Sequence, residues 1–157
     1  FQQLPIKPRR SIVFVAVTSE ECGLLGSQGY CEKPLFPLSK TAVNLNFDGI
    51  APALRTTGVT LRAAGKTNTD ASDHFNFVKK GVPTVLCGGG GEVIDKEKQA
   101  AIPKAYRYHQ PNDEYDESWW NFDGAMENLN LLFSIGVMIA NQDEMPKWAK
   151  DADFQRQ

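Results

Sequence analysis

The sequence has no long apolar run, no large excess of charge of one sign and few cysteines. No apolar run approaches the roughly 20 residues that a helix needs to cross a bilayer, so no membrane span is expected. The 17 basic and 19 acidic side chains give a formal net charge of −2, which does not favour nucleic acid as a partner. Phe1–Arg10 is polar and contains two prolines, a composition that is not typical of a secretory signal.

The three cysteines, Cys22, Cys31 and Cys87, lack the close spacing of a metal-binding pair. Cys22 and Cys31 could form a disulfide, but the sequence does not decide whether they do, so the redox compartment stays open. The 157 residues suit one domain with a core of its own, and 41% hydrophobic and 23% charged residues are ordinary values for such a domain.

Three apolar, β-rich runs predict strands at Ile12–Val17, Ala42–Phe47 and Thr84–Cys87. They are nearly continuous, as expected for strands that are covered on both faces. A fourth candidate, residues 58–65 ("GVTLRAAG"), alternates only weakly between apolar and polar positions.

Helical patterns lie between and after these strands. Ser72–Lys80 has apolar residues at helical spacing and is followed by Gly81, a favourable C-terminal cap. Leu24–Cys31 predicts a short helix weakened by glycine, and residues 117–141 predict a long helix buried against a sheet. Alternation of strands and helices favours an α/β domain with a largely parallel sheet.

A glycine-rich stretch, Cys87–Val93 ("CGGGGEV"), follows the third predicted strand. It lacks the spacing of the known phosphate-binding loops, so we interpret it as a mobile connection. The residues from there to Tyr108 predict a long surface loop of the kind that often borders a site.

Polar side chains stand where the predicted strands end. Glu20 and Glu21 follow the first strand, Asp48 follows the second, and His109 precedes the long helix. Ligands of open α/β sheets bind at the carboxyl ends of the strands, which would bring the carboxylates to one edge. Carboxylates with an imidazole are the ligand chemistry of zinc or of another borderline divalent ion.

Each of these residues also has a plainer interpretation. Asp48 before Gly49 could be a turn residue, and His109 could be an ordinary surface or core histidine. Asp73 could cap the helix that contains His74. The acidic run at residues 113–116 could be a solvated lead into the long helix. Only the Glu20–Glu21 pair is hard to explain as structure, because two adjacent negative charges repel unless water or a cation stabilises them.

Four stretches in order resemble one known family. They are "RRSIVFVAVTSEECGLLGSQGY", "NLNFDG", "SDHFNFVKKGVPTV" and "YHQPNDEYDESW", and they extend from about Arg9 to about Asn141. This pattern is similar to the co-catalytic di-zinc aminopeptidases, whose relatives include leucyl-type bacterial aminopeptidases, glutamate carboxypeptidases and glutaminyl cyclases. The resemblance implies a three-layer α/β/α domain with a largely parallel, mixed central sheet.

The resemblance also implies roles for individual residues. Glu20 would be the general base, and Glu21, Asp48 and His109 would be zinc ligands. The segment Asp73, His74 and Phe75 would help to form the wall of the substrate pocket. In such a site, two metal ions about 3.5–4 Å apart polarise the scissile carbonyl and acidify a water, whose proton the base takes up.

The family pattern requires two further metal-ligand positions, a histidine and a bridging aspartate, ahead of these motifs. Residues 1–47 contain no histidine and no aspartate. We therefore expect the chain to be the C-terminal portion of a catalytic domain, with a connector at 1–10, a core at 11–141 and a polar tail at 142–157. Alone it should be inactive, should bind zinc weakly, singly or not at all, and could self-associate through exposed sheet surface.

Three functions stay open from the sequence. The first is aminopeptidase-type hydrolysis of a peptide substrate by the parent protein. The second is a non-catalytic homologue that acts as a binding or scaffold domain, and the third is a cyclase or carboxypeptidase on the same fold. Bacterial members of the family are commonly secreted or periplasmic, which is the only indication of localisation.

Overall fold

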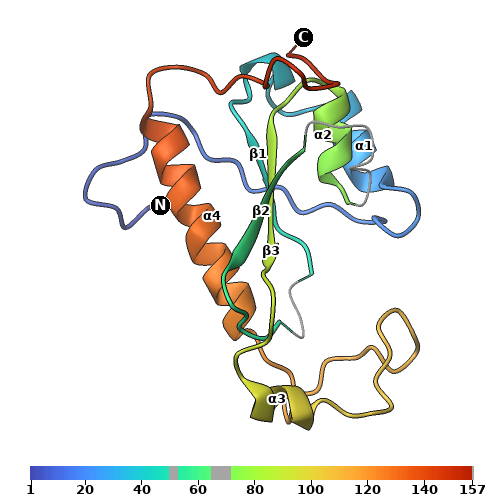
Figure 1. The fold of residues 1–157 in the computed structure, drawn as a ribbon. Coiled ribbons are helices and arrows are strands. Elements are labelled where there is room, and N and C mark those ends of the chain that lie inside the picture. The colour runs from blue at the N-terminus through green and yellow to red at the C-terminus, as the bar shows by residue number, and fades with distance from the viewer. Residues whose placement is uncertain (50–52, 65–71, 157) are drawn as a thin grey trace. The chain divides into compact units, whose positions relative to one another are not determined.

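The computed structural model describes residues 1–49, 53–64 and 72–156, and these form helices and a small β-sheet (Figure 1). The helices are α1 (Leu25–Glu32), α2 (His74–Lys79), α3 (Lys96–Ala101) and α4 (Asp123–Asn141), with a 3-10 turn at Leu38–Lys40. The strands are β1 (Asn44–Asn46), β2 (Val59–Ala64) and β3 (Thr84–Gly89), in the sheet order β1-β3-β2. The α/β class predicted from the sequence is confirmed.

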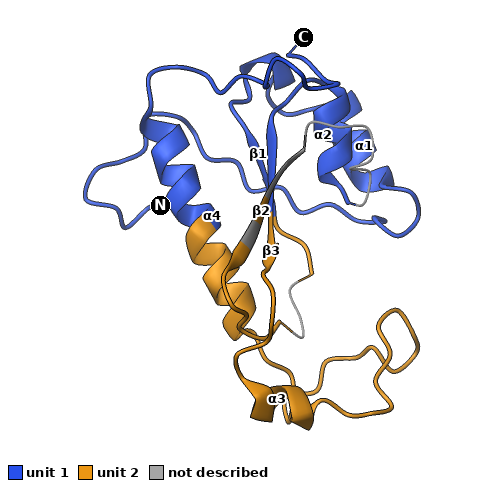
Figure 2. Cartoon of the chain, viewed as in Figure 1, with its two compact units in different colours: residues 1–46, 62–86, 132–157 blue, residues 47–61, 87–131 orange. Residues whose placement is uncertain are grey.

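The chain divides into two compact units (Figure 2). Unit 1 comprises residues 1–46, 62–86 and 132–157, and unit 2 comprises residues 47–61 and 87–131. Each unit is built from segments that lie far apart in the sequence. No helix of the described residues has the length and apolar character that crossing a membrane requires.

Unit 1 contains the parallel pair of strands and the two helices beside it. β1 pairs with β3 in the register Asn44↔Thr84, Leu45↔Val85 and Asn46↔Leu86. Helix α2 packs against α1, and Cys31, Phe77 and Val82 form a buried cluster between them. Gly81 adopts a positive φ of 77° directly after α2, and its N–H donates to the carbonyl of Val78 at 2.8 Å. The predicted glycine stop is thus confirmed.

Arginine side chains tie both terminal segments into unit 1. The Arg10 guanidinium donates to the carbonyl oxygens of Ile139 and Gln142, each at 2.6 Å, at the C-terminal end of α4. Arg156 donates to the carbonyls of Thr41 at 2.8 Å and Ala42 at 3.0 Å. Cations bound to unpaired carbonyls at a helix end satisfy acceptors that no intrahelical donor can reach.

Unit 2 is held together by backbone pairing and by surface ion pairs. Thr56 and Val93 form an antiparallel bridge, and the N–H of Gly90 donates to the Thr56 hydroxyl at 2.7 Å. Lys98 of α3 pairs with Asp123 at the start of α4. This pairing, followed by the hydrogen bond from Asn121, holds the pKa of the Asp123 carboxyl below its usual range.

The predicted strand at Ile12–Val17 is wrong. Residues 11–19 are irregular, and the side chains of Val13, Phe14 and Val15 are 42%, 83% and 41% exposed. A strand exists only through hydrogen bonds to a neighbouring strand, and among the described residues none lies beside this run. High β-propensity was therefore not sufficient here.

Two further element predictions need correction. The stretch before Tyr108 contains α3 rather than loop alone. The long helix begins at Asp123, not at residue 117. The Asn121 side chain accepts the N–H of Asp123 at 2.9 Å, and this bond satisfies a donor at the helix start that has no acceptor within the helix. Its buried positions include Ala125, Asn128, Leu132 and Ile139, whereas Met126, Leu129 and Phe133 are at least 36% exposed.

All three cysteines are free thiols. Cys22 is exposed, and Cys31 and Cys87 are buried. Burial raises the pKa of the Cys31 thiol to about 11, although nearby Lys80 and Lys79 act in the opposite direction. The possible disulfide between Cys22 and Cys31 is absent from this structure.

Candidate active site

Glu20 and Glu21 stand at the start of a tight turn that leads into α1. Ser19 and Leu24 adopt left-handed backbone conformations, with φ of 58° and 61°, and Gly23 between them has φ of 94°. The carbonyl of Glu20 accepts the N–H groups of Gly23 at 3.1 Å and Leu24 at 2.8 Å. Left-handed conformations cost energy for residues other than glycine, so the surrounding contacts must hold this turn in place.

One such contact is a close approach of the α1 backbone to the residue before the turn. The N–H of Gly26 donates to the carbonyl of Thr18 at 3.0 Å. A Cβ atom at Gly26 would overlap that carbonyl oxygen and would lie 2.6 Å from the Thr18 nitrogen. Glycine is therefore required here for packing, although it weakens the helix.

The second contact is a buried amide from α2. Asn76 is 4% exposed, and its Nδ2 donates to the carbonyl of Leu24 at 3.0 Å and to the hydroxyl of Ser27 at 2.8 Å. The Ser27 hydroxyl in turn donates to the Leu24 carbonyl at 3.0 Å. These bonds attach the end of the Glu20–Glu21 turn to α2, within unit 1. Glu20 is half-buried and Glu21 is exposed.

Asp48 lies in unit 2, just after β1. It is exposed, and its Oδ1 accepts the N–H of Gly49 at 2.7 Å. Gly49 has a positive φ of 67°. The turn role that the Asp-Gly sequence suggested is therefore present in the structure, and the carboxylate stays at the surface.

His109 occupies an unusual backbone position in unit 2. Its φ is 61°, its side chain is exposed, and its ring stacks on Tyr108 with centroids 3.8 Å apart. Asp113 braces this conformation, because one carboxylate oxygen accepts the His109 N–H and the other accepts the Tyr106 hydroxyl, each at 2.8 Å. A positive φ in a histidine is uncommon and marks a conformation that the loop imposes.

These hydrogen bonds also shift the titration of the groups that make them. The N–H of His109 and then the hydroxyl of Tyr106 hold the pKa of the Asp113 carboxyl below its usual range. Burial, followed by the hydrogen bond to Asp113, raises the pKa of Tyr106 to about 12. At neutral pH the pair is therefore a neutral hydroxyl and an ionised carboxylate, which is the combination that bonds most strongly.

The Asp73–Phe75 segment opens α2 in unit 1. Asp73 stands at the N-cap position, but its side chain makes no capping hydrogen bond, and its Oδ1 atom is buried without a partner among the described residues. His74 is only 1% exposed. Phe75 packs edge-on against Phe154 with ring centroids 6.2 Å apart.

The structure thus places the sequence-predicted residues in two sets. Glu20 and Glu21 share unit 1 with the Asp73–Phe75 segment, and Asp48 shares unit 2 with His109. Within residues 1–49, 53–64 and 72–156, no group of three or more His, Cys, Asp or Glu side chains could hold a metal ion.

This arrangement bears on zinc, which the resemblance implies. The donor types are those that zinc prefers, but a catalytic zinc ion takes three protein ligands at one point. The described residues, taken alone, do not fit a catalytic zinc ion because they form no such group.

Two residues that sequence reasoning did not select support the predicted ones. Asn76 lies between two phenylalanines in "HFNFV", which indicates that its side chain is buried with them. A buried amide is expected to have hydrogen-bond partners, so this position could have been selected from the sequence. Asp113 was interpreted as part of a solvated acidic run. The Tyr106-to-Asp113 spacing across a Pro- and Asn-containing turn gave only a weak indication of its bracing role.

Comparison with known proteins gave one family. The family model described as peptidase family M28 matches residues 1–71 and 56–134, which together include every residue considered above as catalytic, metal-binding or substrate-binding. No curated protein and no solved structure matched the chain.

Proposed function

The chain belongs to peptidase family M28, a family of generally zinc-dependent peptidases, and we propose that the protein removes residues from the N-terminus of peptide substrates. The family match carries this proposal, since the matched residues include Glu20, Glu21, Asp48 and His109. The general assignment as a peptidase follows from the family itself. The restriction to the N-terminal peptide bond rests on the resemblance of the motifs.

We assign Glu20 as the general base and Glu21 as a metal ligand. At the start of the turn Glu20 is half-buried and Glu21 is exposed, so the two carboxylates have different surroundings, which suits two different tasks. The turn at Ser19–Leu24 and its attachment to Asn76 support this division, because they fix the backbone from which both side chains project. Glu20 would take a proton from the attacking water and deliver it to the leaving amine.

We assign Asp48 and His109 as further metal ligands and the Asp73–Phe75 segment to the wall of the substrate site. The hydrogen bond from the His109 backbone N–H to Asp113 supports its assignment, since it fixes the backbone conformation from which the His109 ring projects. Zinc would supply Lewis-acid chemistry at the scissile carbonyl.

We further propose that these 157 residues alone do not turn over substrate. The support is the ligand count, because residues 1–47 contain no histidine or aspartate and the described residues form no three-donor group. The donors that complete the site would then come from outside this chain. A non-catalytic binding domain of the same family is the second candidate, favoured by the same ligand count.

Zinc content and hydrolysis of aminoacyl anilides test these proposals together. The isolated chain should bind less than one equivalent of zinc and show no turnover. The full-length protein should bind zinc and cleave free, but not N-acetylated, aminoacyl anilides. Absence of both zinc and turnover in the full-length protein would favour the binding domain.

Two variants of the full-length protein separate the roles of the glutamates. Glu20→Gln should lower kcat by about 10²- to 10⁴-fold with zinc content unchanged, as expected for loss of a general base. Glu21→Gln should lower zinc content as well. Glu32→Gln is the matched control, because Glu32 is an exposed carboxylate on α1 and should leave both quantities unchanged. Equal activity of Glu20→Gln and Glu32→Gln would refute the assignment of the base.

A further inference from the structure

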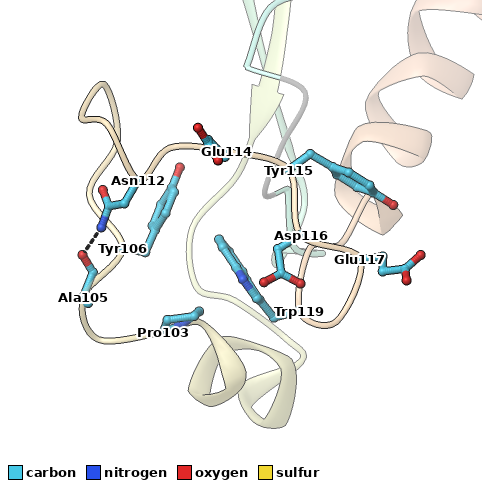
Figure 3. A pocket seen from close by; sticks show the side chains of 9 residues that line it. All are labelled: Pro103, Ala105, Tyr106, Asn112, Glu114, Tyr115, Asp116, Glu117 and Trp119. Atoms are coloured by element: carbon cyan, nitrogen blue, oxygen red, sulfur yellow. Dashed lines mark hydrogen bonds between the residues drawn. The ribbon is translucent and has the colours of Figure 1, made fainter.

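A pocket of about 650 Å³ opens within unit 2, along the loop that follows α3 (Figure 3). Its lining combines the aromatic residues Tyr106 and Trp119 with the acidic residues Glu114, Asp116 and Glu117. No lysine or arginine is among the described residues that line it. The volume is within the range of sites that hold a small molecule or a side chain.

The aromatic part of the wall is fixed by its own contacts. The rings of Tyr106 and Trp119 meet edge to face, with centroids 5.0 Å apart and an interplanar angle of 61°. Trp119 packs in turn against Trp120 at 5.9 Å, and the Tyr106 hydroxyl donates to Asp113 at 2.8 Å. A ligand would therefore find these rings in place, without the entropy cost of ordering them.

One carboxylate is held beside this aromatic wall. In Figure 3 Asp116 lies next to Trp119, whereas the carboxylate of Glu117 points away from it. The Oδ1 atom of Asp116 accepts the Ser118 hydroxyl at 2.6 Å and the Ser118 N–H at 2.9 Å. These two bonds hold the pKa of the Asp116 carboxyl below its usual range, so it is ionised at neutral pH.

Arg107, a basic residue of the same loop, is bound elsewhere. Arg107 donates to the carbonyls of Lys104 and Tyr106, each at 2.7 Å, so its guanidinium is bound to the backbone of its own loop. Neither Arg107 nor Lys104 lines the pocket. The acidic lining therefore faces the pocket without a cation of this loop beside it.

We propose that this pocket binds the guanidinium group of an arginine side chain in a peptide. A guanidinium is planar and stacks on aromatic rings, and its N–H groups match the geometry of a carboxylate. The Trp119 ring and the Asp116 carboxylate supply both contacts from one wall. The choice of a peptide as the carrier rests on the proposed peptidase function, but binding is measured without turnover.

Isothermal titration calorimetry of the 157-residue chain tests this inference. The two probes are N-acetyl-L-arginine methylamide and its citrulline analogue, which has nearly the same shape and no charge. The arginine probe should bind about tenfold more tightly, from one exposed ion pair and one cation–π contact. The difference should shrink in 1 M NaCl, where screening is strong.

Asp116→Asn is the informative variant because the asparagine keeps an Oδ1 acceptor for both Ser118 bonds. It should weaken arginine binding about fivefold, the upper end for an exposed pair, and leave citrulline binding unchanged. Glu97→Gln is the matched control, since Glu97 is an exposed acid on α3 that does not line the pocket. It should change binding of either probe less than twofold.

Several results would overturn the inference: absence of binding, equal binding of the two probes, or equal losses in Asp116→Asn and Glu97→Gln. The last result would mean that general charge, not this pocket, attracts arginine. The outcome is independent of catalysis. Selective arginine binding with no peptidase activity in the full-length protein would leave the inference intact and refute the proposed function.

Discussion

The close approach of α1 to Thr18 predicts opposite effects for one chemical change at two positions of a short helix. Replacing glycine by alanine inside a helix normally stabilises it by about 0.5–1 kcal/mol. At Gly26 the new Cβ would overlap the backbone carbonyl of Thr18, which cannot rotate away as a side chain could. Overpacking of this kind costs about 1–3 kcal/mol. We therefore expect Gly26→Ala to lower the free energy of unfolding by about 1 kcal/mol or more.

Gly29 of the same helix is the control. A Cβ there would meet no atom within 4 Å, so Gly29→Ala should give only the helical gain. Both variants add one methyl group to α1 and change no charge. Their difference therefore reports the contact with Thr18 rather than helix propensity.

Urea denaturation followed by circular dichroism at 222 nm measures both effects. With a slope of about 2 kcal/mol/M, the midpoint should fall by about 0.5 M or more for Gly26→Ala and rise by about 0.3 M for Gly29→Ala. Stabilisation by both substitutions would refute the reasoning. It would mean that the α1 backbone does not approach Thr18, and that the turn carrying Glu20 and Glu21 lies elsewhere.

Three other predictions follow from single contacts. Asn76→Ala should lower the free energy of unfolding by about 2–3 kcal/mol, because it breaks two buried hydrogen bonds. Gln28→Ala, which removes an exposed amide, is the control and should lower it by less than about 0.5 kcal/mol. Similar urea midpoints for the two variants would refute this prediction. Lys98→Gln should raise the pKa of Asp123 in an NMR titration, and an unchanged pKa would exclude the pair. Because the folded-state pKa of Asp123 is lowered, its stabilising effect is present above its unfolded pKa of about 3.9 and is lost as pH falls through the folded value. In the native chain only the Cys22 thiol should react rapidly with a disulfide reagent, and rapid reaction of all three thiols would contradict the burial of the other two.

Local sequence patterns predicted the elements whose determinants are local. The α2 helix ends where Gly81 supplies a left-handed residue, and the run at Thr84–Cys87 forms the start of β3. The run at Ile12–Val17 has the same β-rich character and forms no strand. The difference is the partner, because β3 has β1 beside it and residues 12–17 have no neighbouring strand among the described residues.

The residues of the candidate site were selected from the sequence, and their roles stay predictions, whereas the contacts that support them were not predicted. The order of the motifs selected Glu20, Glu21 and His109 as candidates. The role of Asn76 depends on groups about fifty residues earlier in the chain, and no local pattern contains that contact. The Asp113 brace is local, but it competes with the simpler interpretation of an acidic run as solvated surface.

The discontinuous construction of unit 1 has a consequence for how the chain folds as it is made. Synthesis proceeds from the N-terminus, and folding units close as their residues become available. All the segments of unit 2 have been made once residue 131 is added, whereas unit 1 also needs residues 132–157. The carbonyls of Thr41 and Ala42 lack the donor that binds them until Arg156, 115 and 114 residues later, has been made. The turn that carries Glu20 and Glu21 is thus synthesised before any segment of unit 2, yet it belongs to the unit that is completed after unit 2.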